Sequence, residues 1–445
     1  MRSSRRELFS KMFSCANFFF ASNILVSQQS NEEEKESRFS NEYISGDNRY
    51  EQKRFENFVI TVGQDSTSDI QGRTEKAIQG GIDYLAKFGG GVVKVRNGVY
   101  EFSNSLFLRS GVKILGDGDE VLFLKRPAKE TKLTKESDWY EAYISVEDPE
   151  FFQVGEGICI QTKNPHTGGR VVIKRTIVGI EESKLILDKP LRENVWSKRD
   201  TVISSLYPLV SGEYIQDVVI ENVRLDGNKE HNPFLDGNYA GCIWLQDCKS
   251  IVLSKVEAKN YNGDGISWQI VHDLTVSQCC SHHNAGLGLH PGSGSQRARI
   301  LNSKVENNDI GIFFCWGAKF GLVEGCHISN NKIGISIGHS DSYNIIRNNK
   351  IVNSYQRALL FRAEDERFIA TGNIVKNNLI ENLLESTGRA ISLEGAHIDN
   401  KIVDNDILDN LGPYNKVGIW VGKNAKRNII EGNRVVGFYK EISEE

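Results

Sequence analysis

Short runs in which small, apolar and variable residues alternate return along most of the chain. Each run follows the pattern small, apolar, variable, apolar, as in Gly265-Ile-Ser-Trp and Gly334-Ile-Ser-Ile. The phrases begin at Gly265, Gly286, Gly311, Gly334, Ala358, Ala390 and Gly418. The first starting points lie 21, 25, 23 and 24 residues apart, and a repeat of this period indicates one supersecondary unit of a stacked array.

The segments between these phrases are short β-branched runs with period two, separated by Asn and Gly. The run Asn344-Ile-Ile-Arg-Asn-Asn-Lys-Ile-Val-Asn-Ser is an example. No repeat carries a helical stripe long enough for a leucine-rich or helical array, whereas Asn and Gly suit left-handed corners between short strands. We therefore expect an all-β fold, a single-stranded right-handed parallel β-helix. Its ends must be capped, because each rung buries its inner face only against its neighbours.

Stacking turns the repeat into columns of side chains spaced by roughly 4.8 Å along the coil axis. With the Gly or Ala of each phrase numbered zero, positions one and three are apolar and are expected to point inward. Positions zero, two and four are then expected to point outward. The fourth position is mixed, as either a ligand-facing surface or a plain solvated sheet face would be; it holds Gln269, His290, Cys315, Gly338, Arg362, Glu394 and Gly422.

The repeats are preceded by a helix and interrupted by an insertion. Residues 69–88 place apolar side chains mostly at helical spacing and are followed by Gly89-Gly90-Gly91, so a helix is expected to cap the coil. The rhythm is lost between Lys125 and Ser205, where residues 178–188 predict a hairpin. This insertion either walls one side of a groove or is a structural elaboration without a ligand. The expected order is an export signal over 1–27, a polar linker over 28–55, the cap and first rungs over 56–124, the β-rich insertion over 125–205 and the main β-helix over 206–445.

Composition narrows the function classes. The 445 residues carry a net charge of -4, which gives no whole-chain basic signal for nucleic acid. No run approaches the roughly 18 apolar residues of a membrane span. The segment Ser4-Arg5-Arg6-Glu7-Leu8-Phe9-Ser10-Lys11 precedes a semi-apolar stretch and resembles a twin-arginine export signal, with a disordered basic tail as the alternative.

The eight cysteines lack the paired spacing of a zinc ribbon. Cys242, Cys279 and Cys326 occupy or adjoin strand positions where a small polarizable residue can stack inward. Buried thiols are therefore favoured over disulfides.

The region before the insertion resembles the N-terminal module of the pectate-lyase-like superfamily. The resemblance rests on a helix followed by Gly89-Gly-Gly-Val-Val, then Asn97-Gly-Val-Tyr, then Ser110-Gly-Val-Lys-Ile-Leu-Gly-Asp-Gly. It covers about residues 60–120 closely and 212–440 by repeat architecture. The superfamily includes polygalacturonases, lyases and phage tailspikes, so the resemblance implies a β-helix that meets polysaccharides.

The polygalacturonase motif provides a sharper comparison. Asn262-Gly263-Asp264-Gly265 looks like its first element, Asn-Thr-Asp-Gly, but Asn284-Ala285-Gly286 stands where an Asp pair belongs. Neither Gly-His-Gly nor Arg-Ile-Lys follows. Inverting hydrolysis requires two carboxylates roughly 6.5–9.5 Å apart, so the mechanism of that family does not carry over.

Ionisable residues, an aromatic residue and Gly turns converge on one edge of the expected sheet over four consecutive rungs. A lyase needs a base that takes the proton beside a uronate carboxylate and cationic groups that hold the developing enolate. The candidate catalytic residues are His290, His339, Arg362 and Asp264. The candidate substrate-binding residues are Gln269, Trp316, Asp341, Arg357, Glu364, Arg389 and Glu394. The plainer interpretations are turn histidines and a structural ion pair between Arg362 and Glu394.

The sequence thus predicts an exported carbohydrate-active enzyme that cleaves an acidic polysaccharide, with β-elimination preferred over hydrolysis. The alternatives are a hydrolase that uses Asp264 and a noncatalytic glycan-binding or adhesion β-helix. The expected partner is a polysaccharide or oligosaccharide. No cofactor is expected, although Glu364, Asp365 and Glu366 make Ca²⁺ conceivable.

Overall fold

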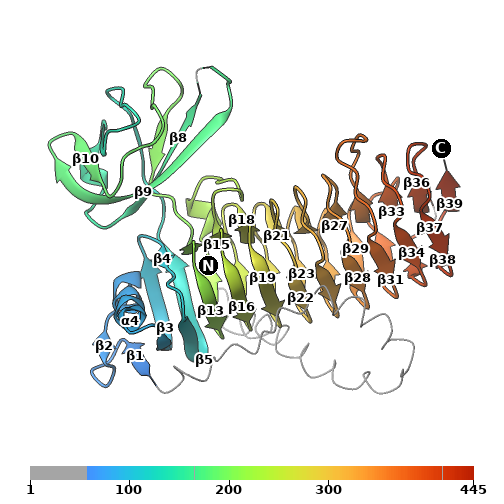
Figure 1. Cartoon of the computed structure of the whole chain (residues 1–445), viewed down its shortest axis with the longest axis horizontal. Coiled ribbons are helices and arrows are strands. Elements are labelled where there is room, and N and C mark those ends of the chain that lie inside the picture. The colour runs from blue at the N-terminus through green and yellow to red at the C-terminus, as the bar shows by residue number, and fades with distance from the viewer. Residues whose placement is uncertain (1–57, 165, 413, 445) are drawn as a thin grey trace, which may run out of the picture.

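The computed structural model describes residues 58–164, 166–412 and 414–444. The expected export signal and linker lie outside these residues. The described chain is almost entirely β, and its long part winds as a right-handed parallel β-helix (Figure 1). One α-helix, α4 (Glu75–Lys87), covers the N-terminal end of the coil and buries Ile78, Ile82 and Leu85 against it. Residues 69–74, expected to be helical, instead hold strand β2 (Ile70–Gln71) and the residue before the helix, Thr74.

Each complete rung contributes one strand to an 11-stranded sheet, called sheet B here, and two strands to a 22-stranded sheet, called sheet A. Sheet B consists of β4 (Leu106–Phe107), β12 (Val210–Glu213), β15 (Gly241–Gln246), β18 (Asp264–Gln269), β21 (Leu287–Pro291), β24 (Ile310–Phe313), β27 (Ile333–Ile337), β30 (Arg357–Phe361), β33 (Arg389–Leu393), β36 (Val417–Val421) and β39 (Lys440–Glu444).

Sheet A begins with β1 (Val59–Gly63), β2, β3 (Gly91–Phe102) and β5 (Val112–Lys125). One of its two parallel ladders continues through β13 (Gln216–Glu221), β16 (Lys249–Ser254), β19 (His272–Ser277), β22 (Arg299–Leu301), β25 (Leu322–Glu324), β28 (Ile345–Arg347), β31 (Ile374–Lys376), β34 (Lys401–Val403) and β37 (Ile429–Glu431). The other continues through β14 (Arg224–Asp226), β17 (Glu257–Lys259), β20 (Cys280–His282), β23 (Lys304–Glu306), β26 (His327–Ser329), β29 (Lys350–Ser354), β32 (Leu379–Leu383), β35 (Asp406–Leu408) and β38 (Arg434–Val436).

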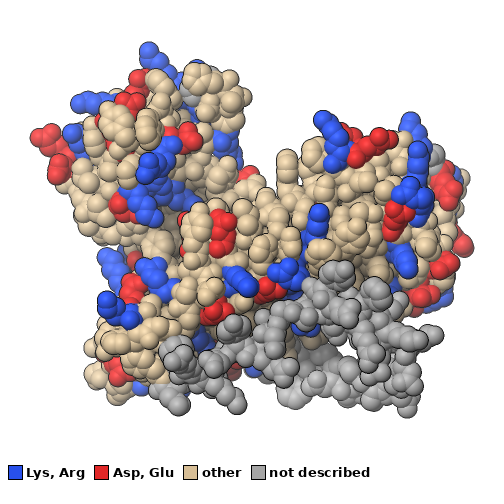
Figure 2. Space-filling model, viewed as in Figure 1, with Lys and Arg blue, Asp and Glu red and all other residues tan. Residues whose placement is uncertain are grey.

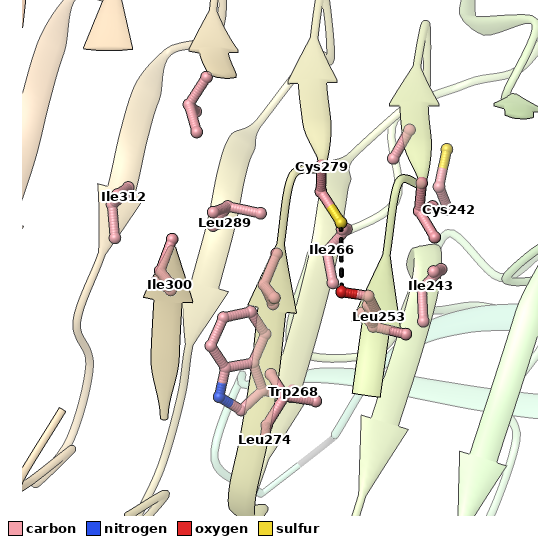
Figure 3. Packing of buried hydrophobic residues seen from close by; sticks show 14 of the residues in the cluster. Cys242, Ile243, Leu253, Ile266, Trp268, Leu274, Cys279, Leu289, Ile300 and Ile312 are labelled. Atoms are coloured by element: carbon pink, nitrogen blue, oxygen red, sulfur yellow. Dashed lines mark hydrogen bonds between the residues drawn. The ribbon is translucent and has the colours of Figure 1, made fainter. Parts of the chain in front are cut away.

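Positions one and three point inward, as predicted, and form the core. Ile243, Ile266, Leu289 and Ile312 occupy position one in four successive rungs and are almost completely buried (Figure 3). Position zero also faces the interior, so the prediction that it points outward was wrong. A Cβ at Gly265 would lie 2.1 Å from Ser281 Oγ, and one at Gly288 would lie 2.5 Å from the Val305 side chain. Position zero is therefore small because it faces the inner wall of the coil.

One phrase was also placed in the wrong register. Ile266 pairs with Leu289 and Ser267 with His290, so Gly288, and not Gly286, is the counterpart of Gly265. His290 accordingly lies at position two, beside Ser267, and not in the fourth column. The outward positions are two and four, together with the residue that precedes position zero. That preceding residue is Asp264 in β18 and Arg357 in β30.

Asn stabilises the corners in two distinct ways. The first Asn of several pairs has a positive φ, as at Asn330 (55°) and Asn348 (54°), which fits the predicted left-handed corners. Other Asn side chains stack inside the coil and bond to the next rung: Asn344 with Asn373, Asn400 and Asn428, and Asn349 with Asn378, Asn405 and Asn433. These ladders satisfy backbone groups that would otherwise be buried without partners.

The seven described cysteines are free thiols. Cys242, Cys279 and Cys326 are buried, as predicted. The Cys279 thiol lies 3.4 Å from the carbonyl oxygen of Leu253 (Figure 3).

Residues 130–204 form a separate antiparallel sheet at the N-terminal end of the coil (Figure 1). Its order is β6 (Glu130–Lys132), β11 (Val202–Ser204), β8 (Gly157–Lys163), β9 (Arg170–Glu181), β10 (Lys184–Leu187) and β7 (Tyr143–Ser145). The strands β9 and β10 form the predicted hairpin. This sheet has its own apolar core around Ile144, Ile160 and Leu185, distinct from the core of the coil.

Candidate functional site

The outer face of sheet B carries most of the candidate residues. The antiparallel sheet rises at one end of this face, and the loop that follows β30, residues 363–370, lies toward the other. Figure 2 shows the molecule hollowed between the antiparallel sheet and the later rungs. The antiparallel sheet contacts the outer face directly, since Lys174 of β9 lies over the ring of Trp244 in β15. An extended ligand would therefore meet residues from β15 to β36 along one face.

Asp264 and His290 form a buried pair on this face. His290 Nδ1 donates to Asp264 Oδ2 at 2.8 Å, because a carboxylate only accepts, and the backbone N–H of Leu287 donates to Asp264 Oδ1 at 2.9 Å. Ser267 Oγ lies 3.3 Å from the same imidazole nitrogen and donates to the carbonyl oxygen of Gly237. These contacts fix the ring and leave Nε2 of His290 buried, with no hydrogen-bond partner in the described part of the chain.

A loop formed by residues 232–240 covers this pair. Asp264 is 2% exposed and His290 3% exposed. Gly237 lies against the carboxylate so closely that a Cβ there would be 1.6 Å from Asp264 Oδ2. A ligand therefore reaches His290 only when this loop moves away.

Arg362 stands at the centre of a second cluster. Its Nη1 donates to Ser336 Oγ at 2.9 Å and its Nη2 to Asp341 Oδ2 at 3.2 Å, while Nε lies 3.6 Å from Glu364 Oε1. Asp341 is fully buried, and burial raises its pKa to about 7 against the opposing effects of Arg362 and two backbone N–H groups.

The ring of Phe313 connects the two clusters. Phe313 occupies position two between His290 and Ser336. Its centroid is 5.5 Å from that of the His290 ring and 4.4 Å from the Arg362 guanidinium carbon. The imidazole and the guanidinium thus lie on the same outward strip of the sheet.

An aromatic stack borders the Arg362 cluster. Trp316 is 57% exposed, and its ring stacks on His339 at 4.6 Å with an interplanar angle of 28°. Phe368, from the loop 363–370, packs 5.0 Å from His339. The His339 imidazole also lies 2.5 Å from Glu364 Oε1. An exposed indole held in this way presents a flat apolar surface next to charged groups.

Glu394 is paired differently from the expectation. The predicted ion pair with Arg362 is absent from the described contacts. Glu394 Oε1 instead accepts from Arg357 Nε at 3.1 Å, from Arg389 Nη1 at 3.3 Å and from Ser392 Oγ at 2.8 Å. Arg362 has Asp341 and Glu364 as its acidic partners, so the arginines form two separate clusters.

The remaining candidates are less accessible than expected. Gln269 is 7% exposed, and its Oε1 accepts from the backbone N–H of Ser293. Sequence reasoning missed Ser267, Phe313 and Ser336 because position two was not examined as a column, although its polar and aromatic members were visible once the register was known. It also missed Lys174, since nothing in the repeat indicates where the antiparallel sheet packs.

No group of three or more His, Cys, Asp or Glu side chains within 58–164, 166–412 and 414–444 is arranged to hold a metal ion. Glu364 is engaged by His339 and Arg362, and Asp365 by Arg367. Among the same residues, no helix is long and apolar enough to cross a membrane.

Comparison with known proteins supports the fold. The sequence model described as periplasmic copper-binding protein (NosD) matches residues 163–368, and the model described as right handed beta helix region matches residues 315–435. The chain belongs to the superfamily of right-handed parallel β-helix proteins. Neither match spans half of its 445 residues. No curated protein sequence matches the chain.

Solved structures share the architecture at low identity. The A-module of the Azotobacter vinelandii mannuronan C-5 epimerase AlgE4 is 13% identical, with a TM-score of 0.52 over 83% of this chain and 93% of that one. The Dettilon tailspike protein (gp208) is 13% identical, with a TM-score of 0.52 over 86% of this chain and 68% of that one. An exopolygalacturonase from Thermotoga maritima is 15% identical, with a TM-score of 0.47 over 83% of this chain and 86% of that one. At these identities the likeness concerns the fold alone.

Proposed function

We propose that this protein is an exported enzyme that cleaves an acidic polysaccharide on the outer face of sheet B by β-elimination, with His290 as the base. The observation that carries the proposal is the Asp264–His290 pair. Asp264 holds the proton on Nδ1, so neutral His290 has an unprotonated Nε2, which is the form a general base requires.

The proposed step balances as follows. Nε2 of His290 takes the proton from the carbon that bears the uronate carboxylate. The electron pair left behind forms a carbon–carbon double bond, and the glycosidic oxygen at the neighbouring carbon leaves and takes up a proton. Arg362, on the same outward strip, provides positive charge for the enolate that develops on the carboxylate. Trp316 offers a face for a sugar ring beside it.

Substrate access requires movement of the loop 232–240, because Asp264 and His290 are buried beneath it. We propose that the polysaccharide displaces this loop from the pair, while the rungs beneath remain in place. Closure of a loop over a reacting group is a common way to exclude water.

The test is incubation with polygalacturonate, alginate and neutral dextran. A rise in ultraviolet absorbance from an unsaturated uronide supports elimination, whereas new reducing ends without that absorbance indicate hydrolysis. His290→Ala is expected to abolish the absorbance change, and Asp264→Asn to lower the rate by about 10²- to 10⁴-fold. His166→Ala, an exposed histidine of the antiparallel sheet, is the matched control. Full cleavage by His290→Ala would refute the assignment.

Noncatalytic glycan binding is the second candidate, and the burial of Asp264 and His290 favours it. In that case Trp316, Arg362 and their neighbours hold a glycan without any reaction. Binding that is lost in Trp316→Ala but kept in His290→Ala, with no product in either, would establish it.

Export is part of the proposal. The family description that matches residues 163–368 includes the word periplasmic, and Arg5-Arg6 belongs to the predicted twin-arginine-like signal. Replacing both arginines by lysine should leave the protein in the cytoplasm, as measured by cell fractionation. Export of the double variant at the normal level would contradict this route.

A further inference from the structure

Two arginines lie directly opposite each other on adjacent strands of sheet B. Arg357 begins β30, Arg389 begins β33, and the two are register partners. Both side chains are partly exposed, 21% for Arg357 and 27% for Arg389. Like charges directly opposite on neighbouring strands destabilise a sheet. The fold therefore places two positive charges where packing alone would disfavour them.

One carboxylate serves both guanidinium groups. Glu394 Oε1 accepts from Arg357 Nε and Arg389 Nη1, and also from Ser392 Oγ. The three ionised side chains together carry a net charge of +1, since two arginines face one glutamate. A guanidinium has five N–H donors in a planar fork that suits a second carboxylate.

Trp420 fixes the orientation of one guanidinium. The Arg389 guanidinium carbon lies 3.9 Å from the centroid of the Trp420 ring, which is a cation–π geometry. Trp420 follows Ser392 in the outward column of position two. An indole beside two fixed guanidinium groups combines a flat apolar surface with a positive charge.

We infer that Arg357, Arg389 and Trp420 form a subsite for the carboxylate and ring of one acidic sugar residue. This subsite rests on the proposed function and specifies its substrate as a polyuronate. The ladder runs from His290 through β24, β27 and β30 to Arg389 in β33. Four steps of roughly 4.8 Å place the subsite about 19 Å from His290 along the coil. The polymer then lies along the coil axis and reaches the subsite only when it is several sugars long.

Binding of intact protein to polygalacturonate and alginate tests the inference, with the carboxyl-reduced, neutral forms of the same polymers for comparison. Each of Arg357→Gln and Arg389→Gln is expected to weaken binding of the acidic polymers about tenfold, the effect of one lost charged hydrogen bond. Binding of the neutral polymers should not change. Shortening the acidic polymer to a disaccharide should remove the difference between variants and wild type.

Arg427→Gln is the matched control, because Arg427 is also paired with one carboxylate, that of Asp399, but lies outside sheet B. Thermal unfolding of each variant verifies that the fold is retained, and Arg389→Lys provides a milder replacement should Arg389→Gln unfold. Unchanged affinity in the Arg357 and Arg389 variants, or an equal loss in Arg427→Gln, would overturn the subsite. Preference of wild type for a sulfated over a carboxylated polymer would overturn the uronate assignment.

The two proposals fail in different ways. Tight, arginine-dependent binding of polyuronates without any cleavage would refute the enzyme and retain the subsite. Cleavage that does not depend on Arg357 and Arg389 would retain the enzyme and refute the subsite.

Discussion

Lys125 provides a stringent test of the packing inside the coil. It ends β5 and is completely buried. Its Nζ donates to Asn262 Oδ1 at 3.0 Å and lies 4.6 Å and 5.1 Å from the ring centroids of Tyr261 and Tyr207. Burial lowers its pKa to about 7, since the Asn262 amide and the two rings do not replace the hydration of an ammonium ion.

The sign of the pH effect follows from proton binding. The pKa of lysine in the unfolded chain is about 10.4, so above pH 7 the unfolded state holds a proton that the folded state has released. Stability must then rise with pH, by about 2 kcal/mol between pH 7 and pH 8.5 at 1.36 kcal/mol per unit. Below pH 7 both states are protonated and this contribution is constant.

Lys125→Met keeps the side-chain volume and removes the titration. Urea unfolding followed by circular dichroism at pH 7 and pH 8.5 should show the gain of about 2 kcal/mol in the wild type relative to Lys125→Met. Lys174 also titrates near pH 7, and the buried thiols titrate in the opposite sense at higher pH. Both are shared by the two proteins and cancel in the comparison. Identical pH dependence in wild type and variant would refute a buried, depressed Lys125.

Three further outcomes are expected. Asn378→Ala should lower the free energy of unfolding by about 3 kcal/mol, because it removes the acceptor of the buried Asn349 backbone N–H, whereas exposed Asn410→Ala should have almost no effect; equal losses in urea melts would contradict the ladder. Trp316→Ala should weaken polysaccharide affinity about tenfold in a binding titration without lowering the melting temperature, because the ring is mostly exposed. Gly334→Val should destabilise the protein by about 1–3 kcal/mol, because its Cβ would lie 2.4 Å from a backbone oxygen; a variant as stable as wild type would show that position zero is not enclosed.

The repeat was sufficient to predict the architecture, but not its register in one rung. Gly286 and Gly288 each precede a leucine, so the small-apolar pattern fits both. Their difference lies in the neighbouring rungs, because only Gly288 lies against Val305 and the carbonyl of Gly311. This contact is set by the closed coil and is not contained in the local pattern.

The accessibility of the site was also beyond the sequence. The alternation showed which side Asp264 and Gln269 point to, but outward side chains are exposed only when nothing covers them. The loop 232–240 covers Asp264 through Gly237, and Ser293 covers Gln269. A loop has no periodicity that relates it to the strand it packs on, so its position depends on long-range contacts.

The corrected register nevertheless supplies a signal that the sequence does contain. Position zero now falls at Cys242, Gly265, Gly288, Gly311 and Gly334, so successive rungs are 23 residues long (265−242, 288−265, 311−288 and 334−311). The rung from Ala358 to Ala390 has 32 residues and the next, to Gly418, has 28. A rung whose strands must keep their neighbours' spacing can place additional residues only in its loops. The longest rung contains the loop 363–370, which brings Glu364 and Phe368 to the aromatic stack. Departures from a constant rung length therefore locate site loops, provided that the register is determined first.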